Sequence, residues 1–156
     1  IPGYDYGFTL SANYSGFDVA LFFHGVGDVQ KFNGIRAAGE SMNTNGRNQF
    51  TTVLNAWTAD HPSNSMPRAV YGDPNNNNRF SDRFVENAGY LRLQNLQIGY
   101  AVPQKFLDET NVFRALRIYV SGINLFTITK YSGLDPEVDN GNPPTRQFLL
   151  GINASF

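Results

Sequence analysis

The sequence contains no cysteine and only two histidines, His24 and His61. Without cysteine the chain has neither disulfides nor thiolate ligands, and this absence fits a reducing compartment as well as a disulfide-free envelope protein. The two histidines lie in a strand-like stretch and in a loop; a catalytic or metal-binding pair would require them to converge in the fold, which the sequence does not show, and two unrelated histidines are the preferred interpretation. No enzyme signature is present. We therefore expect a protein that is not an enzyme, with no catalytic residues, no metal and no cofactor.

Charge of one sign and long apolar runs are also lacking. The net charge is −1, from 12 basic and 13 acidic residues, so the sequence indicates no nucleic-acid-binding surface. No run of about 18 apolar residues occurs, which excludes a membrane-spanning helix but not membrane-spanning strands, because those alternate apolar and polar residues. The start at 1–6 has no signal-peptide pattern and enters a strand pattern almost at once. We expect the chain to be part of a longer protein.

The sequence is rich in stretches that alternate apolar and polar residues. A period of two predicts a strand with one apolar face. In the final stretch, 146–156, the even positions are all apolar: Phe148, Leu150, Ile152, Ala154 and Phe156. Its length fits the roughly 9–11 residues with which a tilted strand crosses a bilayer, and it ends on an aromatic ring. An apolar face that contacts lipid is consistent with this ending.

Four further strands are predicted in the same way. Residues 4–14 and 17–24 alternate on either side of Ser15-Gly16, which predicts a tight β-hairpin. A strand at 90–101 changes phase near Gln94-Asn95, which predicts a β-bulge. A helical turn is expected at 104–109, and the fourth strand begins near Ala115 and continues to Ile128.

The connections between the predicted strands differ strongly in length. Residues 28–88 are rich in Asn, Gly, Ser and Pro, and Phe50, Val53, Leu54 and Trp57 have the spacing of a short amphipathic helix. A second polar loop follows at 131–145. Both long loops fall at one end of the strands and the short turns at the other, as in outer-membrane barrels. Five strands cannot close a barrel, which needs about eight, so we expect the remaining strands upstream.

Several stretches resemble the SusC/RagA family. Residues 90–103 resemble a late barrel strand of that family, 117–131 its penultimate strand, and Gly133-Leu134-Asp135-Pro136-Glu137 the loop motif that follows. The final strand with its terminal phenylalanine is similar too, and 57–68 and 81–84 are similar more weakly. The resemblance extends over essentially the whole chain.

The resemblance implies an all-β fold in which antiparallel strands form the C-terminal wall, about five strands, of a large transmembrane β-barrel with long extracellular loops. Family members are TonB-dependent transporters of the Gram-negative outer membrane, with an N-terminal plug and a barrel of about 22 strands. By this resemblance residues 1–156 are the C-terminal part of the barrel, without plug or earlier strands, and 28–88 is a long extracellular loop with a short helix. The implied function is uptake of an oligosaccharide or a peptide.

The resemblance also implies the partners. These are a SusD-like surface lipoprotein, TonB (through the absent N-terminal part), the glycan or peptide substrate and outer-membrane lipid, with no nucleic acid. The alternative is a secreted carbohydrate-binding β-sandwich module, since alternation alone does not distinguish the two. Two features favour the barrel: no charged residue falls on an apolar strand face, where Arg or Lys at mid-bilayer would cost about 2–4 kcal/mol, and Tyr and Phe cluster toward strand ends.

Candidate site residues follow from this arrangement. The lumen-facing candidates are Arg92, Gln94, Arg117 and Tyr119, and the candidates for contacts in the extracellular loop are Trp57, Asn76 and Asn77. The terminal Phe156 resembles the assembly signal of the family and is the candidate for that role. In the loop 131–145, oxygen ligands for Ca²⁺ are available from Asp135, Glu137, Asp139 and Asn140. Their spacing is not that of an EF-hand, so a solvated loop is the preferred interpretation and Ca²⁺ binding is left open.

Overall fold

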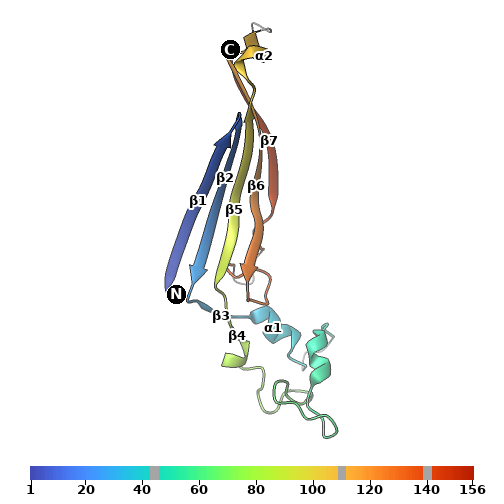
Figure 1. Cartoon of the computed structure of the whole chain (residues 1–156). Coiled ribbons are helices and arrows are strands. Elements are labelled where there is room, and N and C mark those ends of the chain that lie inside the picture. Colours follow the sequence, from blue (N-terminus) through green and yellow to red (C-terminus); the bar gives the residue numbers. More distant parts are fainter. Residues whose placement is uncertain (43–45, 109–111, 139–141) are drawn as a thin grey trace.

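A computed structural model describes residues 1–42, 46–108, 112–138 and 142–156. Five antiparallel strands form one curved sheet in the order β1-β2-β5-β6-β7, and β3 pairs with β4 in a separate two-stranded sheet (Figure 1). The strands of the large sheet are β1 (Tyr4–Tyr14), β2 (Phe17–Gly27), β5 (Tyr90–Ala101), β6 (Ala115–Thr129) and β7 (Gln147–Ser155). The predicted strands are thus confirmed.

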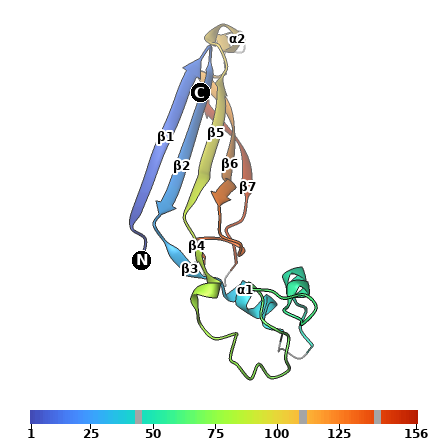
Figure 2. The same ribbon diagram turned by 60° about the horizontal axis from the view of Figure 1, so that its bottom comes forward.

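The two ends of the sheet differ as expected from the loop lengths. One end, here called the turn end, carries the β1–β2 turn, the short helix α2 (Gln104–Asp108) and the C-terminus; the other, the loop end, carries the described residues between 28 and 88 (Figures 1 and 2). Ser15 and Gly16 close the β1–β2 hairpin with φ of 49° and 87°. Positive φ at both central positions is the geometry of a type I′ turn, which matches the twist of the flanking strands.

The β-bulge predicted near Gln94-Asn95 is confirmed. Phe22 pairs with Asn95 and Phe23 with Leu93, so that Gln94 has no opposite residue in β2. The neighbouring strand is irregular at the same level, because Asn95 pairs with Ile123 whereas Leu93 pairs with Phe126. Asn124 lies there with a φ of 53°. The irregularity keeps the apolar residues on one face although β5 changes phase, and β6 keeps its apolar residues at even positions on both sides of it.

The strand register separates two chemically different faces. Val19, Ile98, Val120 and Leu150 lie in one row across four strands, and similar apolar rows lie above and below it. The charged residues of the five strands all lie on the opposite face: Asp5, Asp18, Arg92 and Arg117. The apolar face is not covered, and Phe148 and Leu150 in β7 are 74% and 75% exposed.

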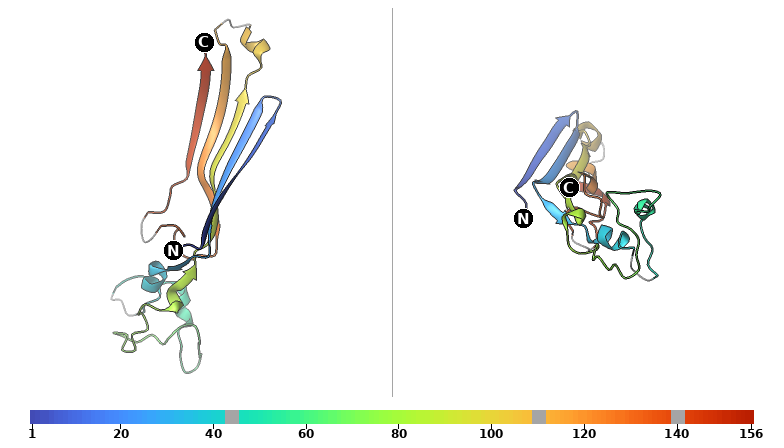
Figure 3. Two further views of the ribbon diagram at one scale, coloured as in Figure 1. Left: turned by 90° about the vertical axis from the view of Figure 1, so that its left-hand side faces the viewer. Right: turned by 90° about the horizontal axis from the view of Figure 1, so that it is seen from below.

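No second sheet packs on the apolar face among the described residues, since the two-stranded sheet lies beyond the loop end (Figure 3). A β-sandwich would bury both inner faces against each other. The β-sandwich module considered as an alternative is therefore not the fold of this chain. Aromatic residues lie on the apolar face at both ends, with Tyr4 and Tyr6 at the loop end and Tyr14 and Phe17 at the turn end. Such girdles are typical of membrane interfaces.

The described residues of 28–88, here called the loop unit, form a small folded body (Figure 2). It contains β3 (Gln30–Phe32), α1 (Gly34–Gly39), 3₁₀ turns at Thr51–Asn55 and Asp82–Phe84, and β4 (Val85–Asn87). Its buried apolar residues are Ala37, Met66, Phe84 and Ala88. None of the helices in the described ranges is long and apolar enough to cross a membrane.

The amphipathic α-helix expected over 50–57 is not present; the segment forms the 3₁₀ helix Thr51–Asn55, none of whose residues is buried. Two adjacent threonines and Val53 are β-branched and disfavour a longer α-helix. Phe50 packs its ring against Gly39 at the end of α1 instead of forming a stripe with Leu54, which is 82% exposed. The spacing was correct for a helix, but the apolar residues have different partners.

Candidate functional site

At the turn end, the polar face carries an ion pair between the two strands that flank β5. Arg117 of β6 reaches across β5 to Asp18 of β2, with Nε donating to Oδ1 at 2.9 Å. Its guanidinium passes directly over Gly99, where any side chain would collide with it. Tyr119 stacks near the same guanidinium at 5.1 Å, and its ring covers Gly151 of β7. Arg117 and Tyr119 are therefore held on the face where the sequence placed them.

At the loop end, Arg92 of β5 lies at the centre of a buried cluster. It is 3% exposed and donates from Nη2 to Asp135 and from Nη1 to Glu137, both at 2.7 Å, and from Nε to Thr127 at 2.9 Å. Tyr90 lies beneath its guanidinium at 5.0 Å. A buried charge is stable only when it is paired and its donors are satisfied. Arg92 meets this condition by binding the loop that follows β6.

His24 connects this cluster to β1. Its Nε2 lies 2.8 Å from Asp5 and its Nδ1 lies 3.3 Å from the Tyr90 hydroxyl. Since a carboxylate only accepts, the proton is on Nε2, and in the neutral ring Nδ1 accepts from Tyr90. An open cavity of about 400 Å³ adjoins these groups and is also lined by Lys31 and Glu137.

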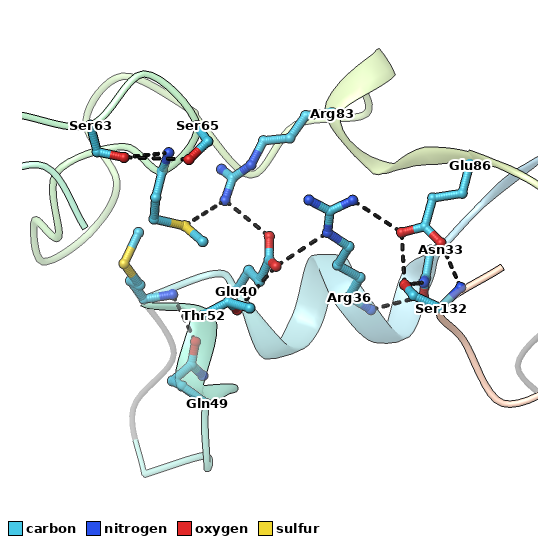
Figure 4. A network of polar contacts seen from close by, with 12 residues as sticks. Asn33, Arg36, Glu40, Gln49, Thr52, Ser63, Ser65, Arg83, Glu86 and Ser132 are labelled. Carbon is cyan, nitrogen blue, oxygen red and sulfur yellow. Dashed lines mark hydrogen bonds and ion pairs between the residues drawn. The ribbon is translucent and has the colours of Figure 1, made fainter. Parts of the chain in front are cut away.

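In the loop unit, Glu40 is the centre of a second network (Figure 4). This carboxylate is 3% exposed and accepts from Arg36 at 3.2 Å, from Arg83 at 3.2 Å and from Thr52 at 3.1 Å. Asn33 caps the N-terminus of helix α1, and its side chain accepts from the Arg36 backbone N–H at 2.9 Å. Three segments distant in sequence are thus joined at one buried charge.

Glu86 connects the loop unit to the loop after β6. It accepts from the backbone N–H and hydroxyl of Ser132, at 2.8 and 2.9 Å, and from Arg36 at 3.0 Å (Figure 4). Burial alone would raise the pKa of this carboxyl, but the hydrogen bonds from Ser132, Arg36 and Asn33 outweigh it and lower the pKa below its ordinary value. Glu86 therefore remains an acceptor well into the acidic range.

The candidate contacts in the loop unit are more constrained than the sequence suggested. Asp73 accepts from the backbone N–H groups of Asn77 and Asn78 and from the Asn77 amide, so the asparagine tract is a fixed turn. Burial tends to raise the pKa of Asp73, and these bonds lower it overall. Asn76 remains exposed, whereas one amide donor of Asn77 is already occupied. Trp57 is partly exposed in the same unit.

Of the four residues considered as oxygen ligands for Ca²⁺, two, Asp139 and Asn140, lie outside the described residues. Asp135 and Glu137 are both bound to Arg92. Across the ranges that the structure describes, no group of His, Cys, Asp and Glu side chains is arranged to hold a metal. His61 lies in the loop unit, where its backbone N–H donates to Thr58, and does not join His24.

Sequence reasoning did not find the partners of Arg92 or the role of Glu40. The Asp-Pro-Glu sequence at 135–137 could have indicated an arginine partner. Its two carboxylates are separated by one residue and can bind the two ends of one guanidinium group. Glu40 carried no such signal. Gln94 lies at the bulge and is exposed.

Known proteins with similar sequence and structure are TonB-dependent receptors. TonB-dependent receptor P3 of Formosa agariphila is 29% identical over 174 residues, covering 99% of this chain and 16% of that receptor. TonB-dependent receptor SusC of Bacteroides thetaiotaomicron is 38% identical over 100 residues, covering 60% of this chain and 10% of SusC. No protein-family model matches the chain.

Solved structures give the same result. The RagAB peptide importer in its open-open state matches with a TM-score of 0.86 and 32% identity, and in its closed-closed state with 0.88 and 31%; each match covers 100% of this chain and 17% of the other. The chain thus spans about a sixth of the length of these relatives.

An antiparallel sheet with an uncharged, uncovered outer face, matched throughout by such receptors, is part of the wall of an outer-membrane β-barrel. The relatives are named receptors, importers or transporters, and none is named an enzyme. The chain belongs to the SusC/RagA family of TonB-dependent receptors and corresponds to the C-terminal portion of their barrel. The predicted family, fold class and outer-membrane location are confirmed.

Proposed function

We propose that the whole protein imports an oligosaccharide or a peptide across the outer membrane, driven by TonB through its N-terminal part, and that this chain is one section of the barrel wall. The observation that supports this most is the separation of the sheet into an uncharged outer face and a polar inner face. Such a wall needs lipid on one side and a hydrated interior on the other.

The polar face fits a neutral, hydrogen-bonding solute or a plug better than an ion. Its charges are of both signs, and the two arginines are each paired with acidic residues. A dedicated ion pore would show one sign of charge along the lumen. Arg92, Gln94, Arg117 and Tyr119 are proposed as its lumen-facing residues. RagAB is described as a peptide importer, which supports the peptide alternative by similarity.

Transport is tested with the whole protein in its own host. We expect that deleting its gene abolishes growth on the cognate nutrient as sole carbon source, and that deleting tonB has the same effect. Oligosaccharides and peptides are supplied in parallel to distinguish the two substrate classes. If growth on every tested substrate were unaffected by either deletion, the proposal would be contradicted.

The loop unit is proposed to face the cell exterior and to contact a SusD-like surface lipoprotein. Phe50, Leu54 and Trp57 are all exposed on it, although they do not form the expected α-helix. Exposed apolar residues grouped in this way are typical of interaction sites. Trp57, Asn76 and Asn77 are proposed contact residues of this loop.

We expect Leu54→Asp to reduce co-purification of the lipoprotein, because a charge at the centre of an apolar interface typically costs about 1–3 kcal/mol. Leu54 is 82% exposed, so the fold of the loop unit should not change. Val112→Asp, at an exposed position of the turn end, is the matched control. Equal lipoprotein yields from both variants and the unaltered protein would show that this surface does not dock the partner.

Phe156 is proposed as the barrel-assembly signal. Its ring is exposed and touches Phe113 with a centroid distance of 5.2 Å, so it contributes little to the core. Removing it should lower the amount of barrel in the outer membrane, measured by immunoblotting of membrane fractions. An unchanged amount would exclude this role.

A further inference from the structure

The segment Tyr131–Val138, here called the strap, is bound at two places that belong to different parts of the molecule. It follows β6 and crosses the loop end of the polar face. The barrel wall binds its later half through side chains, and the loop unit binds Ser132 in its first half and the carbonyls of Asp135 and Pro136 in its later half.

The wall holds the strap through Arg92. Asp135 and Glu137 take the two ends of one guanidinium at 2.7 Å each, and Arg92 is itself fixed by Thr127 of the adjacent strand. Asp135 also accepts from the backbone N–H groups of Glu137 and Val138, at 2.9 and 3.3 Å. The strap is therefore folded into a tight turn around the carboxylate that Arg92 binds, and it cannot leave without exposing a buried charge.

The loop unit holds the strap through β3 and β4. Glu86 binds the backbone N–H and hydroxyl of Ser132, and Asn33 donates to the same hydroxyl at 3.0 Å. Lys31 donates to the carbonyls of Asp135 and Pro136, at 3.4 and 3.2 Å. Glu86 is in turn bound to Arg36, which belongs to the Glu40 network. The strap is thus connected to the interior of the loop unit.

The covalent connections of the loop unit do not fix its orientation. The chain leaves the sheet after β2 and returns into β5, and these two strands are neighbours. Neighbouring strands lie about 5 Å apart, so the two crossings form a narrow hinge about which the unit could tilt. The strap comes from the far side of β5, since it follows β6. A third attachment away from the hinge line would oppose such tilting.

We propose that the strap locks the orientation of the loop unit relative to the barrel wall, and that Arg92 is the positioning residue of this lock. Arg92 lies on the lumen face of β5, whereas the exposed apolar residues lie in the loop unit. Through the strap, Arg92 then determines how the loop unit and these apolar residues are oriented. The consequence for partner binding rests on the proposed function, whereas the lock itself does not.

The lock is tested by measuring a distance in the whole protein in detergent. This chain has no cysteine, so cysteines introduced at Tyr71 in the loop unit and at Lys105 in α2 take up spin labels specifically, after any cysteine elsewhere in the protein is replaced. We expect one narrow distance distribution for the unaltered wall. Arg92→Gln should broaden it, since the wall end of the strap is released.

Two further variants distinguish a lock from a general loss of structure. Arg117→Gln breaks the ion pair at the opposite end of the same face and should leave the distribution narrow. Glu86→Ala removes the two hydrogen bonds from Ser132 to the loop unit without altering the membrane-spanning sheet, and it should broaden the distribution even if Arg92→Gln fails to assemble. A narrow distribution in Glu86→Ala, or in an assembled Arg92→Gln, would overturn the proposal. The distance measurement does not involve the lipoprotein. A failure to detect lipoprotein binding would therefore contradict only the proposed docking role and not the lock.

Discussion

Val120→Arg is expected to remove most of the barrel from the outer membrane. Val120 lies midway along β6, between Ile98 and Leu150 on the apolar face, and is half exposed. An arginine on the lipid side costs about 2–4 kcal/mol at the bilayer midplane, because its charge has no water or partner there. The measurement is the amount of heat-modifiable protein in outer-membrane fractions, which reports folded barrel.

Ser121→Arg is the matched control for this change. Ser121 is the next residue of the same strand and lies on the polar face beside Gln97. The same charge there should be tolerated, because the lumen is hydrated. If both variants assembled equally well, the assignment of the apolar face to lipid would be wrong.

Glu40→Ala is expected to open the loop unit while the barrel remains assembled. The change leaves Arg36 and Arg83 without their shared buried carboxylate. Breaking a buried ion pair costs about 3–5 kcal/mol, and we expect a value near the lower end because both arginines keep partial contact with water. Limited proteolysis of the purified protein should then cut within 46–81, and the unaltered protein should be cut there much more slowly.

The exposed carboxylate of Asp82 provides the comparison. Asp82→Ala changes the same charge in the same unit without removing a partner from Glu40, and should leave the cleavage pattern unchanged. Loss of heat-modifiable barrel in Glu40→Ala would contradict the expectation, since it would mean that the loop unit is required for assembly of the wall.

The wall could be predicted from the sequence because its signals are local. A period of two fixes which residues share a face, and a one-residue phase change at Gln94 locates the bulge before any partner strand is known. The candidate site could be predicted only in part. Arg92 was identified from its face, but its ligands lie 43 and 45 residues further along, in a loop whose path no periodicity records.

The loop unit was the least predictable part. Its centre, Glu40, is defined by contacts with Thr52 and Arg83, which lie 12 and 43 residues away. The spacing of Phe50, Val53, Leu54 and Trp57 predicted an α-helix, yet Phe50 packs against Gly39 and the segment becomes a short 3₁₀ helix. Where tertiary contacts decide, spacing alone is a weak guide.

Because β5 and β6 are irregular at Gln94 and Asn124, the number of residues in these strands determines which side chains face the lumen. Strand β5 consists of two halves of opposite parity joined at that level, whereas the residues of β6 on the apolar face stay at even positions throughout. Loss of the single codon for Gln94 would turn Tyr90 and Arg92 toward lipid and bring Leu91 and Leu93 inside. Insertions and deletions along this part of the gene should therefore survive selection only in even numbers or in compensating pairs, while the loops beyond remain free to change length.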